Sequence, residues 1–122
     1  RKGTRDYIAR IETMGEEFLQ LYLEKSELLY LLIGETGGNP RLQVQLIEIY
    51  QQLAETVEEE LQAGREAGEI FPYSDMKTIA YSLVGMGQSA AILISTGGKS
   101  QLEKARKTIH DLLRHALSVD RS

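Results

Sequence analysis

Through most of this chain, apolar residues recur three and four positions apart, and this spacing restricts the fold more than any other feature. It places the apolar side chains along one face of an α-helix, whereas a half-buried strand would alternate them with polar ones. Both prolines and the glycine pairs at 37–38 and 97–98 fall between these stretches. The sequence therefore predicts an all-α domain, a bundle of about five helices.

Residue types that favour helix ends give the expected boundaries. A first helix is expected over residues 4–24, and a short second one from Ser26 to the glycines at 34, 37 and 38. Asn39 and Pro40 are typical of a helix start, so a third helix is predicted from there to Ala67, although its opening LQVQL alternates like a strand. A fourth is predicted from Asp75 to Ser95 or Thr96, and a fifth from the capping box Ser100-Gln101-Leu102-Glu103.

The stretch ELQAGREAGEIFPYSD contains two glycines four residues apart, Gly64 and Gly68, just before a predicted helix start. We expect Gly64 to lie in the last turns of the third helix, where a neighbouring segment approaches closely. Gly68 is expected to end that helix, with Ile70 and Phe71 packing back against it before Pro72. The chain should reverse direction here.

Composition excludes several classes of protein. At 122 residues the chain has room for one domain with its own core. Its 14 basic and 18 acidic residues give a net charge of -4, so this segment is not expected to bind nucleic acid or an anionic membrane by itself. It has no cysteine, which favours a reducing compartment such as the cytoplasm. The longest apolar run, Ile79–Ile94, is interrupted by Ser, Gly and Gln, so no membrane span is expected.

Four segments together resemble one family. ELQAGREAGEI ends a long helix, SDMKTIAYSLVGMGQSA begins an alanine- and glycine-containing one, and KARKTIHDLLRHAL forms the last. With YLEKSELLYLLIGET, where Lys25 and Ser26 replace a His-Pro often found in the family, these segments resemble the C-terminal domain of tetracycline-repressor (TetR) family regulators. The resemblance covers nearly the whole chain.

The resemblance implies a function for residues 1–122 as the C-terminal ligand-binding and dimerisation domain of a bacterial transcriptional repressor. Because the chain begins at Arg1, we expect it to be part of a longer protein whose N-terminal helix-turn-helix binds operator DNA. A small hydrophobic or aromatic effector would release that DNA. The family implies a cytoplasmic homodimer with no cofactor and no enzymatic activity.

An apolar stripe on the first, third and fourth helices is a candidate ligand pocket. A pocket needs apolar walls with a few polar groups to orient its ligand, and Tyr22 and Tyr50 would supply their hydroxyls. The same spacing is equally typical of an ordinary core, and the sequence leaves the two interpretations open. The predicted ligand-binding residues are Met14, Phe18, Tyr22, Tyr50, Leu53, Val57, Leu83 and Met86.

The fourth and fifth helices are predicted to form the dimer interface. The fourth is apolar on more than one side and the fifth has a broad apolar stripe, so a monomer would expose a large apolar patch. A two-fold axis would let each copy cover the other. The predicted interface residues are Val84, Gly85, Gln88, Ile92, Ile109, Leu113, Ala116 and Leu117.

No motif predicts a metal site or catalysis. His110 and His115 are five residues apart and so lie on different helical faces, and no nucleotide-binding or nucleophile motif occurs. The main alternative function is a helical interaction or signalling module without a small ligand. A helix-bundle enzyme is a weaker third alternative. A closed cavity would favour the ligand-binding domain over the interaction module, and converging inward carboxylates or histidines would favour the enzyme.

Overall fold

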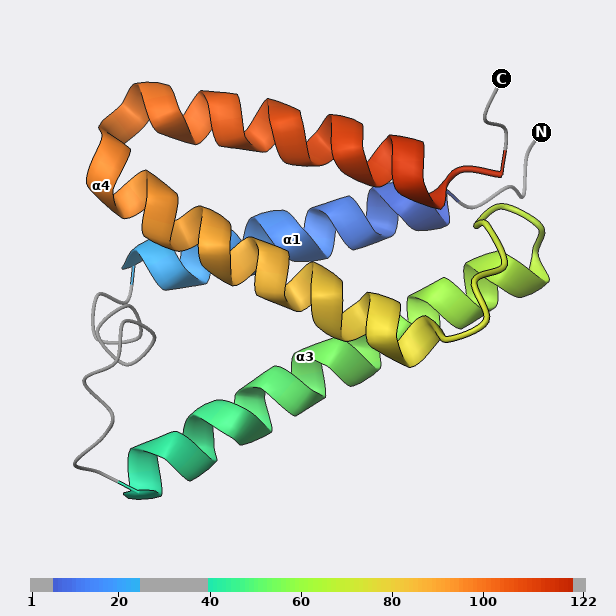
Figure 1. Cartoon of the computed structure of the whole chain (residues 1–122), viewed down its shortest axis with the longest axis horizontal. Coiled ribbons are helices and arrows are strands. Elements are labelled where there is room, and N and C mark those ends of the chain that lie inside the picture. Colours follow the sequence, from blue (N-terminus) through green and yellow to red (C-terminus); the bar gives the residue numbers. More distant parts are fainter. Residues whose placement is uncertain (1–5, 25–39, 120–122) are drawn as a thin grey trace.

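The computed structural model describes residues 6–24 and 40–119, and within them the chain forms three helices (Figure 1). α1 spans Tyr7–Glu24, α3 spans Pro40–Glu66 and α4 spans Met76–Leu117. Apart from one antiparallel bridge between Ile70 and Ser118, these described residues contain no strand. The predicted all-α class is confirmed.

α4 is broken at Gly98, where the chain reverses direction (Figure 1). Gly98 has φ 79° and ψ -165°, a conformation that a residue with a side chain rarely adopts. Just before the break, the hydroxyls of Ser95 and Thr96 donate to the carbonyls of Ile92 and Leu93 at 2.7 and 2.9 Å, a local bonding pattern that competes with regular helix. We call residues 76–97 the first arm of α4 and residues 99–117 its second arm.

Four of the five predicted helices fall largely within the described residues, and α1 corresponds to the first of them. The predicted third helix corresponds to α3, and the predicted fourth and fifth correspond to the two arms of one long helix. The kink at Gly98 lies within the predicted boundary, glycines 97 and 98, so α4 consists of the two predicted helices. The predicted second helix, from Ser26, lies outside the described residues.

Aspartates stand at the starts of two helices. Asp75 is the N-cap of α4, where its Oδ1 accepts a hydrogen bond from the Thr78 amide at 3.0 Å and its Oδ2 accepts one from the Thr78 hydroxyl at 2.6 Å. Before α1, Asp6 accepts from the Ala9 amide at 2.9 Å. Each carboxylate satisfies an amide that has no partner within its helix. The predicted start of the fourth helix at Asp75 is therefore confirmed.

Gly68 ends α3 as the sequence predicts. It has φ 78°, and two hydrogen bonds close the helix around it: the Gly68 amide donates to the Arg65 carbonyl at 3.0 Å, and the Glu69 amide donates to the Gly64 carbonyl at 2.8 Å. This pair of bonds defines a Schellman motif, which satisfies carbonyls at a helix C-terminus. A Cβ built on Gly64 would lie 2.5 Å from Cδ1 of Ile70, so the expected close approach is also present.

The segment between α3 and α4 packs onto the C-terminal end of the second arm. The Phe71 amide donates to the Leu117 carbonyl at 2.8 Å, and the Tyr73 hydroxyl donates to the Ala116 carbonyl at 2.7 Å. These carbonyls belong to the last turn of α4, where a helix offers them no partner. The connection thereby fixes the end of the second arm beside the end of α3.

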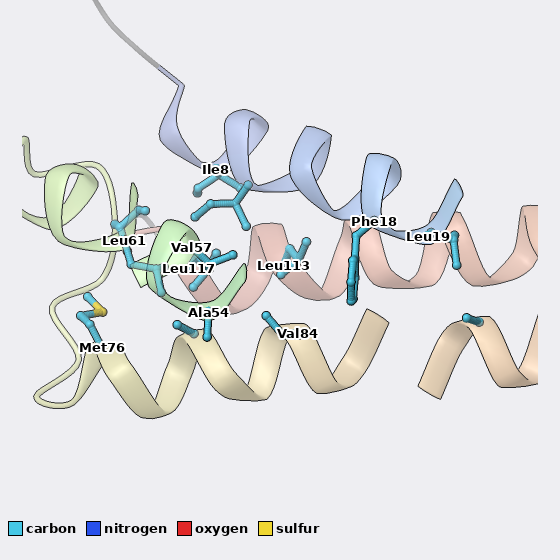
Figure 2. Close-up of a cluster of buried hydrophobic side chains, with 14 of the residues drawn as sticks. Ile8, Phe18, Leu19, Ala54, Val57, Leu61, Met76, Val84, Leu113 and Leu117 are labelled. Atoms are coloured by element: carbon cyan, nitrogen blue, oxygen red, sulfur yellow. The ribbon is translucent and has the colours of Figure 1, made fainter. Parts of the chain in front are cut away.

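The core lies between α1, α3 and both arms of α4 (Figure 2). Its most deeply buried large side chains are Leu61, Ile70, Met76 and Leu117, which meet at the end of the bundle where α3 finishes and α4 begins. Phe18 of α1, Val84 of the first arm and Leu113 of the second arm extend the core along the bundle (Figure 2).

The N-terminal part of α3 extends away from the rest of the bundle (Figure 1). Two of its apolar side chains, Val44 and Ile47, are 54% and 56% exposed. The packed part of α3 begins further along, where Ala54 and Val57 enter the core. α3 is therefore longer than its buried face requires.

Candidate functional site

A cavity of about 370 Å³ lies among α1, α3 and the two arms of α4. Its walls are predominantly apolar, and it is partly open to solvent. Drug-sized ligands occupy clefts of roughly 300 to 1,000 Å³ with this kind of lining, so the cavity is at the small end of that range. The apolar wall residues are Ile11, Met14, Phe18, Leu19, Leu21, Leu53, Val57, Leu83, Val84, Met86, Ala90, Ile109 and Leu113.

Phe18 and Gly87 bring α1 and the first arm together at one wall. A Cβ on Gly87 would lie 3.3 Å from Cδ2 of Phe18, so the absence of a side chain lets the ring pack directly on the first arm. Figure 2 shows Phe18 pointing from α1 between the helices. Because the Phe18 side chain is only 8% exposed, this wall is held by close packing.

Ion pairs join α1 to the second arm along one edge of the cavity. Glu12 bonds to Nδ1 of His110 at 2.9 Å and to Nη2 of Arg114 at 3.2 Å, and Glu16 bonds to Nε of Arg106 at 2.9 Å. The pair with His110 is ionic only when the imidazole is protonated. Successive pairs are four residues apart on both helices, which is the spacing of neighbours on a helical face. We call Glu12, Glu16, Arg106, His110 and Arg114 the ion-pair row.

Glu12 is the most enclosed member of the ion-pair row. Its side chain is 14% exposed, against 50% for Glu16, and both of its oxygens accept hydrogen bonds from Arg114. Burial of Arg114 opposes its charge, but hydrogen bonds and charge attraction from Asp6 and Glu12 outweigh this and raise the Arg114 pKa. The row therefore has one well-satisfied pair at Glu12 and a more exposed, weaker pair at Glu16.

The predicted ligand-binding residues fall into three groups. Met14, Phe18, Leu53, Val57, Leu83 and Met86 line the cavity, so the structure brings these side chains from α1, α3 and the first arm together. The side chain of Tyr22 lies outside the described part of the chain. Tyr50 is not among the cavity-lining residues.

Tyr50 has a different role from the predicted one. Its hydroxyl donates a hydrogen bond to Oε1 of Gln88 on the first arm, and burial raises the pKa of the hydroxyl. A Cβ on Gly85 would lie 3.8 Å from the same hydroxyl. Its spacing from Leu53 and Val57 predicts a shared face, but the polar partner on the first arm holds Tyr50 away from the cavity lining. Tyr50 therefore helps to join α3 to α4.

Several cavity residues were not predicted from the sequence. The second arm supplies a further wall through Arg106, Ile109, His110 and Leu113, and Gly15 lines the cavity from α1. One signal could have shown this wall: the two glutamates at 12 and 16 match the basic residues at 106 and 110 in spacing and opposite charge. Nothing in the apolar pattern indicates which helix faces which.

Three of the predicted dimer-interface residues are buried within a single chain. Val84, Leu113 and Leu117 are 5%, 6% and 1% exposed, so they are in the core and have no free surface to offer a partner. The apolar stripes of both arms pack against α1 and α3 within the chain, and these three residues belong to its core. Gly85, Gln88, Ile92, Ile109 and Ala116 keep an intermediate exposure.

The described residues hold no group of three or more His, Asp or Glu placed to bind a metal ion. One stretch, Met76–Gly98, is long and apolar enough to span a membrane by length and composition. The mean hydropathy of this stretch is high despite its serine, glycine and glutamine residues. In the fold, the same apolar residues include core positions such as Met76, Ala80 and Ala91.

Comparison with known proteins identifies no relative. The sequence matches no family model, and neither a curated protein nor a solved structure is detectably similar to it.

Proposed function

We propose that this chain is the effector-sensing and dimerisation domain of a TetR-type transcriptional regulator, and that its effector is a small, largely apolar molecule. The cavity among α1, α3 and α4 is the observation that carries the proposal. The family assignment rests on the loose sequence resemblance of the helix ends and the last helices. DNA binding would belong to a part of the protein outside these residues.

The size of the cavity favours a ligand site over an imperfect core. Protein interiors are close-packed, and voids larger than a water molecule are few. An enclosed and empty apolar cavity costs roughly 24 cal/mol per Å³, and the walls of this space of about 370 Å³ are mostly apolar. The partial opening to solvent reduces that cost and also gives a ligand a way in.

The position of the cavity suggests how binding would be transmitted. It lies between α1 and both arms of α4, and the ion-pair row joins α1 to the second arm along its edge. A ligand that fits one spacing of these helices better than another would shift the population towards that spacing. α1 is the first helix of the described chain, so a domain preceding it would follow its movement.

Thermal melts with N-phenyl-1-naphthylamine, a neutral and apolar fluorescent probe, test the ligand site. A probe at a hundred times its Kd should add about 2.7 kcal/mol to the free energy of unfolding, seen as a clear rise in Tm. Leu53→Gln puts a polar amide in the cavity wall and should reduce that rise. Ile49→Gln makes the same change at an exposed position of α3 outside the lining and should leave it intact.

Absence of a probe-induced rise in the wild-type chain would count against the ligand site. It would favour the second candidate, a helical protein interaction module. That candidate has its own supporting observation, the exposed apolar side chains Val44 and Ile47 on the extended part of α3.

A further inference from the structure

Gly15 is a glycine in the middle of α1 whose presence close packing does not explain. Glycine destabilises a helix interior relative to alanine, so such a position usually has a packing reason. Gly64 and Gly87 have one, since a Cβ at Gly64 would lie 2.5 Å from Ile70 and one at Gly87 would lie 3.3 Å from Phe18. A Cβ at Gly15 would meet no heavy atom within 4 Å.

The open space beside Gly15 belongs to the cavity. Gly15 is one of its lining residues and is solvent-exposed, one turn from the buried Ile11 and Phe18. It stands three residues after Glu12 and one before Glu16, and both glutamates pair with the second arm. Residues three apart share a helical face, so Gly15 faces the part of the cavity between α1 and that arm.

The ion-pair row flanks this space along α1. Glu12 bonds to His110 and Glu16 bonds to Arg106, so long charged side chains separate the two helices on either side of Gly15. A Cβ at Gly15, between these two pairs along α1, would meet no heavy atom within 4 Å. Ile109 and Leu113 supply the apolar wall on the second arm.

We propose that Gly15 is the size-determining residue of the ligand site: an apolar, uncharged portion of the ligand occupies the space over Gly15 between α1 and the second arm. The inference rests on the proposed function, since it names the part of the ligand that the same cavity selects. Any side chain at position 15 takes up room that the ligand needs.

Fluorescence titration of N-phenyl-1-naphthylamine with the wild type, Gly15→Ala and Gly15→Leu tests the inference. Gly15→Leu should weaken probe binding by about tenfold, because it displaces roughly two methylene-sized contacts, and Gly15→Ala should weaken it by a smaller factor. Thr13→Leu adds a similar apolar side chain to an exposed position of the same helix outside the cavity lining, and should bind as the wild type does.

A smaller probe separates size selection from a general disturbance of the site. 1-Naphthylamine lacks the phenyl ring and leaves more of the cavity empty, so Gly15→Ala should weaken its binding less than it weakens that of the larger probe. Equal losses for both probes would contradict size selection, and so would unchanged binding of the larger probe to Gly15→Ala. If Gly15→Leu does not fold by circular dichroism, the two probes with Gly15→Ala still decide.

The two proposals fail in different ways. If the wild type binds neither probe, the ligand site itself is wrong and the inference falls with it. If the wild type binds and the Gly15 variants bind equally well, the ligand site stands and the role of Gly15 is overturned.

Discussion

At the scale of single residues, a few side chains decide where this chain changes direction. Asp75 accepts two hydrogen bonds from Thr78 at the start of α4, and these bonds lower the pKa of its carboxyl group. The ionised form also lies favourably at the positive end of the helix. The carboxylate is fully exposed, so its contribution comes from capping geometry rather than burial.

Asp75→Ala should lower the Tm by a few degrees at neutral pH, because the first turn of α4 loses its cap. The pKa of Asp75 is lower in the folded chain, so the ionised cap stabilises the fold above the unfolded pKa. That stabilisation is lost as pH falls through the folded pKa, below 3.8. The Tm difference between wild type and variant should therefore shrink in acid.

Asp75→Asn is the control for the pH dependence of this cap. Its side-chain oxygen can still accept the hydrogen bond from the Thr78 amide, but its NH2 group cannot accept the one from the Thr78 hydroxyl. Because the side chain does not titrate, its Tm relative to Asp75→Ala should change little with pH. Thermal melts between about pH 3 and pH 7 would check both variants, on either side of the ordinary aspartate pKa. A wild-type advantage over Asp75→Ala that is undiminished at pH 3 would contradict the role of the ionised carboxylate.

At the scale of elements, the sequence predicts helix ends and helix faces, because both depend on residues that are close together in the chain. The start of α3 at Pro40, the cap at Asp75 and the break at Gly98 follow from which residues can occupy helix ends. The same is true of the side chains that share a face, which is why most of the predicted pocket residues line one cavity.

Relations between elements are harder to obtain from the sequence. The apolar pattern predicts that Leu113 and Leu117 are buried. It does not say whether they pack against another helix of the same chain or against a second copy. Tyr50 shows the same difficulty at one side chain, since its partner Gln88 is distant in sequence. Only the packing of the helices settles such choices.

Gly64→Ala should destabilise the joint between α3 and the segment that follows it. The added methyl would lie 2.5 Å from Cδ1 of Ile70 and 3.0 Å from Cβ of Tyr7. Ile70 is only 1% exposed and has little room to move, so the overlap should cost about 1 to 3 kcal/mol despite the better helix propensity of alanine.

Gly15→Ala is the matched control for this change, since it makes the same substitution inside a helix where the methyl meets nothing within 4 Å. It should stabilise the fold by about 0.5 to 1 kcal/mol through helix propensity alone. Urea unfolding of both variants would measure the contrast. If Gly64→Ala were as stable as Gly15→Ala, the Ile70 side chain would have to shift away from the added methyl at little cost in free energy.

At the scale of the whole molecule, the outward surface of α4 becomes the candidate contact between two copies. Burial of Val84, Leu113 and Leu117 leaves the interface to the opposite sides of the two arms. There Leu93 and Leu112 are each 49% exposed, one on each arm. A second copy that covered these side chains would remove their apolar surface from water.

We expect the chain to be a homodimer at micromolar concentration, and Leu93→Glu to dissociate it. A glutamate at the contact between two-fold related copies would place two unpaired charges in an apolar interface, which should weaken association by about a hundredfold or more. Ile47→Glu makes the same change at a similarly exposed apolar position on α3, and should leave the dimer intact.

Sedimentation equilibrium of the three chains would measure the association directly. A monomeric wild type would contradict the dimer, whereas dissociation by Ile47→Glu but not by Leu93→Glu would move the interface to α3. That second result would favour the interaction module, because the surface joining two chains would then lie on the extended part of α3 and away from the cavity.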